Sequence, residues 1–314
     1  MAQLGEGLSI TGSFSLAATT ENTSSVGYLW FDGTNVKYST YGSGTWSTGG
    51  ALITARRYLA GAGTQNAGLA IGGCTTTACT EEYGGSSWTA GGALITARWG
   101  LAGAGTQDAG LAFGGLNPPT FSYTCTEEYD GSSWTAGGAL ITGRPGLAGV
   151  GTQNSALAIA GYGMGSGTEE YNGTSWASGG NLIFGRQDTG GAGTQNAALA
   201  IGGYYSFSAF NGTEEYNGTS WSSGGDMITS AKELAGAGTQ NAGLAFGGNP
   251  AYSCTEEYDG SSWTAGGALI TGMKQLGGSC AGTQTAALAF GGCSPSALVA
   301  CTEEYTSGIA VCTL

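Results

Sequence analysis

Paired glutamates are the residues of this sequence best suited to chemistry. They occur in six Glu-Glu-Tyr segments, at Glu81/Glu82, Glu127/Glu128, Glu169/Glu170, Glu214/Glu215, Glu256/Glu257 and Glu303/Glu304. Two carboxylates on one surface could exchange protons with a substrate or hold a cation. Each segment is expected to be a β-strand, however, and neighbouring side chains of a strand point to opposite faces. Each pair is therefore split across its sheet, which favours a structural role over catalysis.

Histidine is absent from the chain. The commonest metal ligand and the commonest general base are therefore missing. We find no Ser-His-Asp or Cys-His arrangement, no phosphate-cradling glycine loop and no CxxC zinc spacing. The sequence predicts a protein that is not an enzyme and that binds no cofactor and no metal.

The eight cysteines fall into two groups. Cys74 and Cys79 flank one loop, and Cys293 and Cys301 flank the corresponding loop of the last repeat. Facing positions on a hairpin can bring two cysteines close enough to bridge. The other cysteines have no such partner, so we expect mostly free thiols, with these two pairs as possible disulfides in an oxidising environment.

The charge balance excludes several partners. Eight Lys and Arg face 21 Asp and Glu, which gives a net charge of −13 and a pI near 4.1. Phosphate backbones need clustered basic residues, so nucleic acid is not an expected partner. The N-terminus has neither the basic nor the apolar part of a signal peptide, and no apolar run reaches the ~20 residues of a membrane span. We expect a protein made in the cytoplasm that does not insert into a membrane.

The glutamates belong to a unit that recurs at intervals of 42 to 46 residues. Its marks are Gly-Thr-Gln, Leu-Ala-x-Gly-Gly, Thr-Glu-Glu-Tyr, a turn and a tryptophan. The tryptophans are Trp46, Trp88, Trp134, Trp176, Trp221 and Trp263. A period of this length, with strand-like pieces between turns, is typical of a propeller or a solenoid.

One unit accounts for four short strands. Gly100–Gln107 is rich in small residues and suits an inner strand at a crowded axis, and the apolar Ala109–Gly115 suits a buried second strand. Thr124–Tyr129 forms the third strand, Asp130-Gly131 is a hairpin turn, and Trp134 opens the fourth strand.

The unit resembles the kelch repeat in its double glycine, the tyrosine of the third strand, the tryptophan about six residues later and an arginine before the next first strand. The resemblance implies a β-propeller with one blade per repeat and with the tyrosines and tryptophans in the blade cores. It also implies that the first glutamate of each pair, at Glu81, Glu127, Glu169, Glu214, Glu256 and Glu303, meets the arginine column of Arg56, Arg98, Arg144 and Arg186. Lys232 and Lys274 stand one place away from this column. We expect an ion pair or a backbone acceptor; a ring of cation sites and catalysis are the alternatives.

We predict one all-β domain over residues 1–314, a seven-bladed kelch-like β-propeller with four-stranded blades. The divergent first blade contains Gly27–Gly33 and Lys37–Tyr41 as strands, because Tyr41 precedes Trp46 by five residues as in the other repeats. The N-terminal and C-terminal segments meet in the last blade. The predicted blades cover approximately residues 13–50, 56–95, 98–141, 144–184, 186–229, 231–271 and 274–314, the last closed by 5–12.

The copies differ most in the loop between the second and third strands and in the turn before each first strand. We expect both to lie at one end of the propeller, where divergent loops on rigid strands build binding surfaces. Aromatic and arginine side chains are the usual anchors of such surfaces; neutral drift of the loops is the alternative. The candidate ligand-binding residues are Arg57, Tyr58, Trp99, Pro119, Phe121, Tyr123, Tyr162, Tyr204, Tyr205, Phe207, Phe210 and Tyr252.

The repeats, rich in glycine, serine and threonine and poor in charge, also resemble kelch-type repeats in tail-fibre-like virion proteins of marine bacteriophages. This resemblance implies a structural appendage or decoration protein of a virion, made in the host cytoplasm. Its expected partners are other virion subunits and a ligand on the host cell surface, a glycan or a protein, with carbohydrate binding as the means of adhesion. The alternative is an intracellular kelch-type scaffold for protein interactions, although such scaffolds usually carry further domains.

Overall fold

The structure of the chain is a computed structural model. It describes residues 44–74, 78–163, 165–250, 252–295 and 297–307, and also five strands outside these ranges. The chain divides into two units, Met1–Gly44 with Ser307–Leu314, and Thr45–Thr306. The described residues contain no helix able to cross a membrane.

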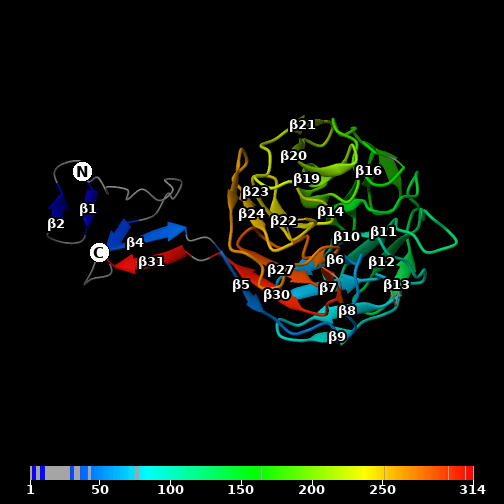
Figure 1. Cartoon of the computed structure of the whole chain (residues 1–314), viewed down its shortest axis with the longest axis horizontal. Helices are drawn as coiled ribbons and strands as arrows, with labels where there is room; N and C mark the ends of the chain where they lie inside the picture. The colour runs from blue at the N-terminus through cyan, green and yellow to red at the C-terminus, as the bar shows by residue number, and fades with distance from the viewer. Residues whose placement is uncertain are drawn as a thin grey trace. The chain divides into compact units, whose positions relative to one another are not determined.

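The unit Thr45–Thr306 is a β-propeller of six four-stranded blades around one axis (Figure 1). Blade 1 contains β6 (Ala60–Thr64), β7 (Ala67–Ile71), β8 (Thr80–Tyr83) and β9 (Trp88–Ala90). Blade 2 contains β10 (Ala102–Gly105), β11 (Gly110–Phe113), β12 (Thr126–Tyr129) and β13 (Trp134–Ala136). Blade 3 contains β14 (Ala148–Thr152), β15 (Ser155–Ile159), β16 (Thr168–Tyr171) and β17 (Trp176–Ser178).

The remaining blades follow the same antiparallel order from the axis outward. Blade 4 contains β18 (Gly190–Thr194), β19 (Ala197–Tyr205), β20 (Ser208–Tyr216) and β21 (Trp221–Ser223). Blade 5 contains β22 (Ala235–Thr239), β23 (Ala242–Phe246), β24 (Thr255–Tyr258) and β25 (Trp263–Ala265). Blade 6 contains β26 (Gly277–Gly278), β27 (Ala286–Phe290), β30 (Thr302–Thr306) and β5 (Thr45–Thr48), with the short hairpin of β28 (Cys293–Ser294) and β29 (Ala297–Leu298) in its loop.

The prediction of seven blades is wrong, because Trp46 closes the last repeat rather than the first. In blade 2 the tyrosine of the third strand pairs with the tryptophan of the fourth, Tyr129 with Trp134. In blade 6 the same pairing joins Tyr305 to Trp46, which lies in β5. The last repeat has no tryptophan of its own because β5, from the other end of the propeller sequence, supplies it. The N-terminal copy is therefore not a blade.

The strands expected in the first blade belong to the other unit. β3 (Leu29–Phe31) pairs with β4 (Val36–Tyr41), and β4 pairs with β31 (Ile309–Thr313) in a three-stranded sheet. Two N-terminal strands, β1 (Ala2–Leu4) and β2 (Leu8–Ile10), pair with each other. The predicted closing segment 5–12 thus contributes no strand to blade 6, and the two ends of the chain meet in the three-stranded sheet instead.

Small residues let the six inner strands pack around the axis. Neighbouring blades touch through these strands. A Cβ on Gly61 of β6 would lie 2.1 Å from the carbonyl oxygen of Gly278, so no side chain fits there. Farther out, Phe113 of blade 2 packs on Trp176 of blade 3, with ring centroids 4.9 Å apart. The hydrophobic core therefore lies between blades rather than within each sheet.

Three side chains in each repeat link a blade to the preceding one. Trp134 Nε1 of blade 2 donates to Thr80 Oγ1 of blade 1 at 3.0 Å. Tyr129 Oη donates to Glu82 Oε1 at 2.5 Å, and Gln107 Nε2 donates to the carbonyl oxygen of Tyr83 at 2.8 Å. All three kinds of link also connect blade 1 to blade 6, so each forms a closed ring.

The tyrosine link uses the second glutamate of each pair. Its members are Tyr129–Glu82, Tyr171–Glu128, Tyr216–Glu170, Tyr258–Glu215, Tyr305–Glu257 and Tyr83–Glu304. Burial and then the neighbouring glutamate raise the pKa of Tyr83, Tyr129 and Tyr171 to about 12. These hydroxyls stay protonated as donors at any physiological pH.

The first glutamate of each pair is buried and holds the connection that enters its own blade. Glu169 accepts the backbone N–H groups of Ile141 and Thr142, at 2.7 and 3.2 Å, and pairs with Arg144. Three further arginines make the same pair: Arg56 with Glu81, Arg98 with Glu127 and Arg186 with Glu214. The glutamate thus acts as both ion-pair partner and backbone acceptor.

Lys232 and Lys274 do not replace the arginine of this pair. Ala231 and Met273 occupy its position in blades 5 and 6, and the lysines follow one residue later. Glu256 and Glu303 still accept two backbone N–H groups each, at 2.7 to 2.9 Å. The backbone bonds are therefore present in all six blades, whereas the cation is present in four.

Deleting residues 1–43 tests the six-bladed closure. This deletion leaves β5 in place, so we expect the propeller to unfold cooperatively within a few degrees of the full chain in calorimetry. Deleting residues 1–48 also removes β5 and Trp46, which exposes a sheet edge and should lower the Tm by about 10 °C or more. Loss of folding in the shorter deletion would contradict this closure.

The buried glutamate should matter more than its arginine. Glu169→Ala leaves Arg144 buried without a counter-charge and frees two backbone N–H groups, so we expect a loss of about 3–5 kcal/mol of unfolding free energy. Arg144→Met reproduces the arrangement of blade 6 and should cost about 1–2 kcal/mol. Urea denaturation of both variants measures the difference; an equal or larger loss for Arg144→Met would contradict the backbone role.

Candidate functional site

The divergent loops and turns lie together at one end of the propeller, here called the loop face. In five of the six blades an isolated backbone bridge joins the turn before the first strand to the end of the second strand or the segment that follows it, and in blade 3 the N–H of Tyr162 donates to the carbonyl oxygen of Pro145 at 2.9 Å. The five bridges are Arg57–Cys74, Trp99–Leu116, Gln187–Tyr204, Lys232–Asn249 and Lys274–Cys293. The backbone at this face is therefore tied to the blades, and the side chains at its surface differ from blade to blade.

One residue of each turn forms a ring around the axis, here called the axial ring. Its members are Tyr58, Gly100, Gly146, Asp188, Glu233 and Gln275, all with φ between 54° and 66°. Each backbone N–H donates to the carbonyl oxygen of the preceding member at 2.8 or 2.9 Å, and Tyr58 closes the ring on Gln275. This left-handed conformation is strained for residues with a Cβ, so the ring is an imposed feature of the fold.

An aromatic hollow of about 340 Å³ lies beside the axial ring. Its aromatic walls are Tyr58, Trp99, Phe121 and Tyr162, and its other lining residues are Gly100, Leu116, Pro145, Gly146, Gln187 and Asp188. The rings of Tyr58 and Trp99 lie 5.1 Å apart. Phe121 is 72% exposed and Tyr162 is 64% exposed, so two of the four rings are available to a ligand. The site combines apolar surfaces with a few polar groups, as small-molecule sites do.

The polar groups at the axis share one network. Gln275 Nε2 donates to Tyr58 Oη at 2.6 Å, and burial raises the pKa of the Tyr58 hydroxyl well above its usual range. Burial, followed by the charge of Glu233, raises the pKa of Asp188 to about 6. Glu233 Oε2 is buried without a hydrogen-bond partner among the described residues. The axis therefore holds two carboxyl groups that repel each other.

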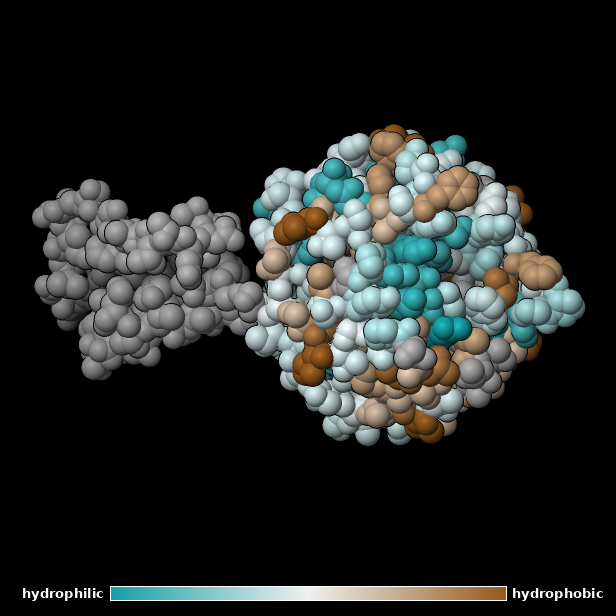
Figure 2. Space-filling view, viewed as in Figure 1, coloured by the Kyte–Doolittle hydropathy of each residue, from teal (hydrophilic) through white to brown (hydrophobic). Residues whose placement is uncertain are grey.

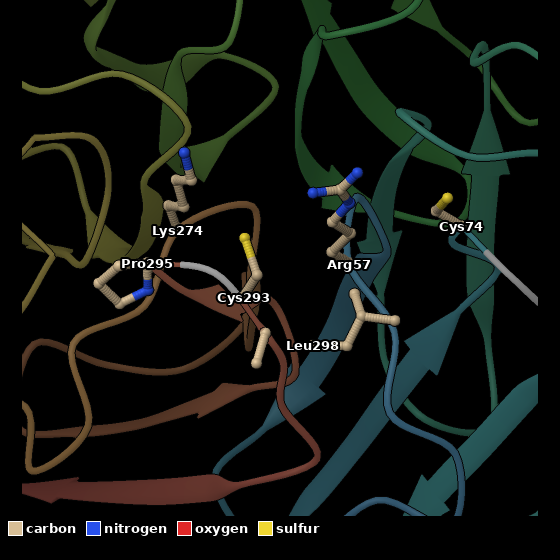
Figure 3. A pocket seen from close by; sticks show the side chains of 7 residues that line it. Arg57, Cys74, Lys274, Cys293, Pro295 and Leu298 are labelled. Carbon is tan, nitrogen blue, oxygen red and sulfur yellow. The ribbon is translucent and has the colours of Figure 1, made fainter.

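A second concavity, the cationic cleft, lies between blades 6 and 1 on the same face (Figure 3). Its volume is about 420 Å³, and its lining residues are Arg57, Cys74, Lys274, Cys293, Pro295, Ala297 and Leu298. Lys274 and Arg57 stand on opposite sides of it, with the thiol of Cys293 between them.

The structure brings four predicted binding residues into the hollow and places the others elsewhere. Arg57 lines the cleft, and Tyr204 lies beneath Lys232, whose Nζ is 4.0 Å from the ring centroid. Tyr205 and Phe210 form a separate cluster with Phe184 near the tip of the long β19–β20 hairpin.

Four predicted binding residues lie outside these groups. Phe207, at the turn of that hairpin, is 93% exposed. Pro119 is exposed in the loop beyond β11, and Tyr123 is half-buried, its N–H donating to Gly115. Tyr252 lies under Lys274, whose Nζ is 5.8 Å from the ring centroid. The loop face is thus not one continuous aromatic surface.

The two cysteine pairs considered as possible disulfides are not bridged in this structure. Cys74, Cys79, Cys293 and Cys301 are all free thiols. Cys293 is directed to Gln275 Oε1 at 3.6 Å, whereas Cys301 contacts Met273 Sδ at 3.3 Å, so the two sulfur atoms have different neighbours. Among the described residues, no three His, Cys, Asp or Glu side chains are placed to share a metal ion.

Several residues of these sites escaped the sequence reasoning. Gln187, Asp188, Glu233 and Gln275 are not among the residues predicted from the sequence, and Lys274 is related there to the arginine column but not to a binding surface. A signal is present in the sequence, because no two repeats share the same pair of residues after the arginine position, while the strands around this pair hardly change. Their convergence at the axis depends on ring closure, which no single repeat shows.

The fold and the loop face define a β-propeller protein of four-stranded blades. Comparison of the chain with protein-family models and with curated proteins finds no match.

Asp188→Asn should make the protein more stable above pH 6. The pKa of Asp188 is about 6 in the folded chain and about 4 when unfolded, so its contribution to stability is present below pH 4 and lost as pH rises through 6. We expect the free energy of unfolding of the variant to exceed that of the wild type by on the order of 1 kcal/mol at pH 8, and this difference to vanish near pH 4. Thermal melts across this range measure it.

Asp130→Asn is the matched control for this prediction. Two other repeats carry asparagine at the same turn, and backbone and hydroxyl donors of Ser133 and Ser132 lower the pKa of Asp130 to about 2. A lowered pKa has the opposite sign, so this variant should gain nothing at pH 8. A gain that is independent of pH in Asp188→Asn would contradict the assignment.

Proposed function

We propose that this protein is a non-enzymatic binding protein, a virion appendage or decoration protein that recognises a glycan on the host cell surface through the aromatic hollow. The resemblance of its repeats to those of tail-fibre-like phage proteins supports the virion role. The observation that carries the proposal of a glycan ligand is the hollow itself.

The chemistry of the hollow suits a sugar ring. A pyranose presents apolar C–H groups on its faces and hydroxyl groups around its edge. Flat aromatic side chains such as Trp99, Phe121 and Tyr162 can pack on those faces, and Gln187 and Asp188 offer polar atoms to the hydroxyls. The backbone of this face is fixed by bridges. A ligand that packs against its exposed rings therefore requires little rearrangement of the protein, which lowers the free-energy cost of binding.

The uses of the repeated carboxylates support a non-enzymatic role. The first glutamate of each pair holds backbone N–H groups, and the second accepts a tyrosine hydroxyl from the next blade. Glu169 and Glu170 illustrate this, since they bind Ile141 and Tyr216 respectively. Both sets of glutamates stabilise the ring of blades, and their carboxylate oxygens are already engaged in these hydrogen bonds.

An intracellular scaffold for protein interactions is the second candidate. The observation that favours it is the hairpin tip at Phe207, where an almost fully exposed aromatic ring stands beyond the cluster of Phe184, Tyr205 and Phe210. Exposed aromatic residues of this kind anchor protein interfaces.

Binding to a glycan panel and to whole bacterial cells distinguishes the two candidates. Trp99→Ala removes a wall of the hollow, and we expect it to weaken glycan and cell binding by at least about tenfold. Phe207→Ala should have an effect below about threefold, and Ile141→Ala, which removes an exposed apolar side chain elsewhere, should behave as wild type.

The opposite pattern would decide against the glycan. Binding of cells or proteins that Phe207→Ala abolishes and Trp99→Ala leaves intact would support the scaffold. If the folded wild-type protein, checked by its thermal melt, binds no glycan and no cell, the proposed function is contradicted.

A further inference from the structure

We propose that the glycan ligand is acidic and that its carboxylate or sulfate group binds in the cationic cleft between Arg57 and Lys274. This inference rests on the proposed function and specifies the class of its ligand. It follows from where the few positive charges of the chain lie.

Positive charge that is not neutralised is scarce in this protein. The chain has eight Lys and Arg against 21 Asp and Glu. Four arginines are buried in pairs with glutamates, and Lys37 belongs to β4 in the other unit. The propeller retains Arg57, Lys232 and Lys274, which have no ion pair among the described residues. All three occupy the same position in their turns, on the loop face.

Two of these three cations line one cleft. Arg57 comes from the turn entering blade 1 and Lys274 from the turn entering blade 6, and they face each other across about 420 Å³ (Figure 3). Their concentration here is opposite to the net charge of −13. Pro295, Ala297 and Leu298 supply apolar wall, which lowers the local dielectric and strengthens the attraction for an anion.

Arg57 has bonding capacity left for a ligand. Its Nε is buried and has no hydrogen-bond partner among the described residues. A guanidinium presents its N–H groups as a planar fork that matches the two oxygens of a carboxylate or sulfate, and a lysine adds a mobile point charge. The Cys293 thiol is the side chain that interacts most strongly with the Arg57 guanidinium. An anion in the cleft would interact with both positive charges at once and would compete with this thiol for the guanidinium.

The cleft and the aromatic hollow are adjacent parts of one surface. Tyr58 contacts a residue of each: its ring centroid lies 5.6 Å from the Arg57 guanidinium carbon of the cleft and 5.1 Å from the ring centroid of Trp99 in the hollow. Gln275, next to Lys274, donates a hydrogen bond to the Tyr58 hydroxyl. A sugar chain crossing Tyr58 therefore reaches the aromatic rings and the two cations together.

The rest of the face limits what the anion can be. Asp188 and Glu233 lie at the axis, and the middle of the propeller face drawn in Figure 2 is hydrophilic, with hydrophobic patches nearer the rim. A polyphosphate backbone needs many cations, whereas this cleft has two. Widely spaced acid groups on a chain of sugar rings fit two cations beside an aromatic hollow.

Polymer pairs that differ only in charge test the proposal. Polygalacturonate is compared with its methyl ester, and dextran sulfate with dextran, by calorimetry at low and moderate salt. We expect the wild type to bind the acidic member of at least one pair about tenfold more tightly or better, with the difference shrinking as salt rises. The pair that shows it identifies the acid group as carboxylate or sulfate.

Charge variants locate the discrimination. In Lys274→Gln, the ratio of affinities for the charged and the neutral polymer should fall at least about fivefold. Arg57→Gln/Lys274→Gln should bind the charged and neutral polymers with equal affinity. Lys232→Gln removes one positive charge from the same position of another turn and should change the ratio less than twofold. Equal effects of Lys232→Gln and Lys274→Gln would show that net charge, not the cleft, is responsible, and would overturn the proposal.

The cleft can also be probed without any glycan, through the free thiol of Cys74. Iodoacetate is anionic and iodoacetamide is neutral, and both alkylate the same thiol. The ratio of their two rates at one cysteine is therefore independent of the intrinsic reactivity of that thiol, and it reports how strongly anions are enriched near it. We expect the ratio at Cys74 to exceed that at the exposed Cys254 by at least about threefold, by mass spectrometry, and to fall to the Cys254 value in Arg57→Gln/Lys274→Gln. No excess in the wild type would overturn the anion site.

The two failures are distinguishable. Equal binding of charged and neutral polymers, abolished by Trp99→Ala, would overturn the acidic ligand and leave the proposed function standing. Enrichment of iodoacetate at Cys74 without binding of any polymer would overturn both the glycan function and the acidic-sugar ligand. Poly-L-glutamate could instead bind in a way that depends on Arg57 and Lys274 and is unchanged in Trp99→Ala. This result would overturn the sugar ligand and identify an acidic peptide as the ligand of the cleft.

Discussion

The pairing of β5 with β30 is the contact on which the propeller depends. Five blades are formed by consecutive strands, and the sixth is completed by Thr45–Thr48, a segment far from it in sequence. Trp46 then packs on Tyr305 and donates to Thr255 of blade 5, as the other tryptophans do in their blades. Closure in this way gives the last blade its fourth strand, and the first and last blades hold each other through the same links as the rest.

Ring closure explains why so much of each repeat is invariant. The tryptophan, tyrosine and glutamine links each span two blades, so each repeat must offer both halves of three contacts. The first glutamate has a different task, holding the N–H groups of the incoming connection. Blades 5 and 6 show that this task survives without an arginine, because Ala231 and Met273 stand beside Glu256 and Glu303.

The repeats differ from one another mainly at the loop face, and the kind of side chain changes from one half of the ring to the other. The turns entering blades 2, 3 and 4 contribute Trp99, Pro145 and Gln187, whereas those entering blades 5, 6 and 1 contribute Lys232, Lys274 and Arg57. The first half lines the aromatic hollow, and two of the three cations of the second half line the cationic cleft. A nearly symmetric scaffold thus presents an asymmetric surface, as recognition of one ligand in one orientation requires.

The sequence alone determined the repeat, its four strands and the residues that lie in the blade cores, because these are local patterns of 42 to 46 residues that recur. It also identified Tyr58, Trp99, Phe121 and Tyr162 as surface aromatics in divergent loops. It could not determine the number of blades. Tyr41 precedes Trp46 by the usual spacing, yet β4 pairs with β31 and Trp46 pairs with Tyr305.

Only the tertiary structure decided which strand completes the last blade and which side chains converge at the axis. Both depend on contacts between residues more than 200 positions apart, such as Trp46 with Thr255 and Gln275 with Tyr58. The local pattern of a repeat carries no information about such pairs. For the same reason the cationic cleft, built from the two ends of the propeller sequence, became visible only when the ring was closed.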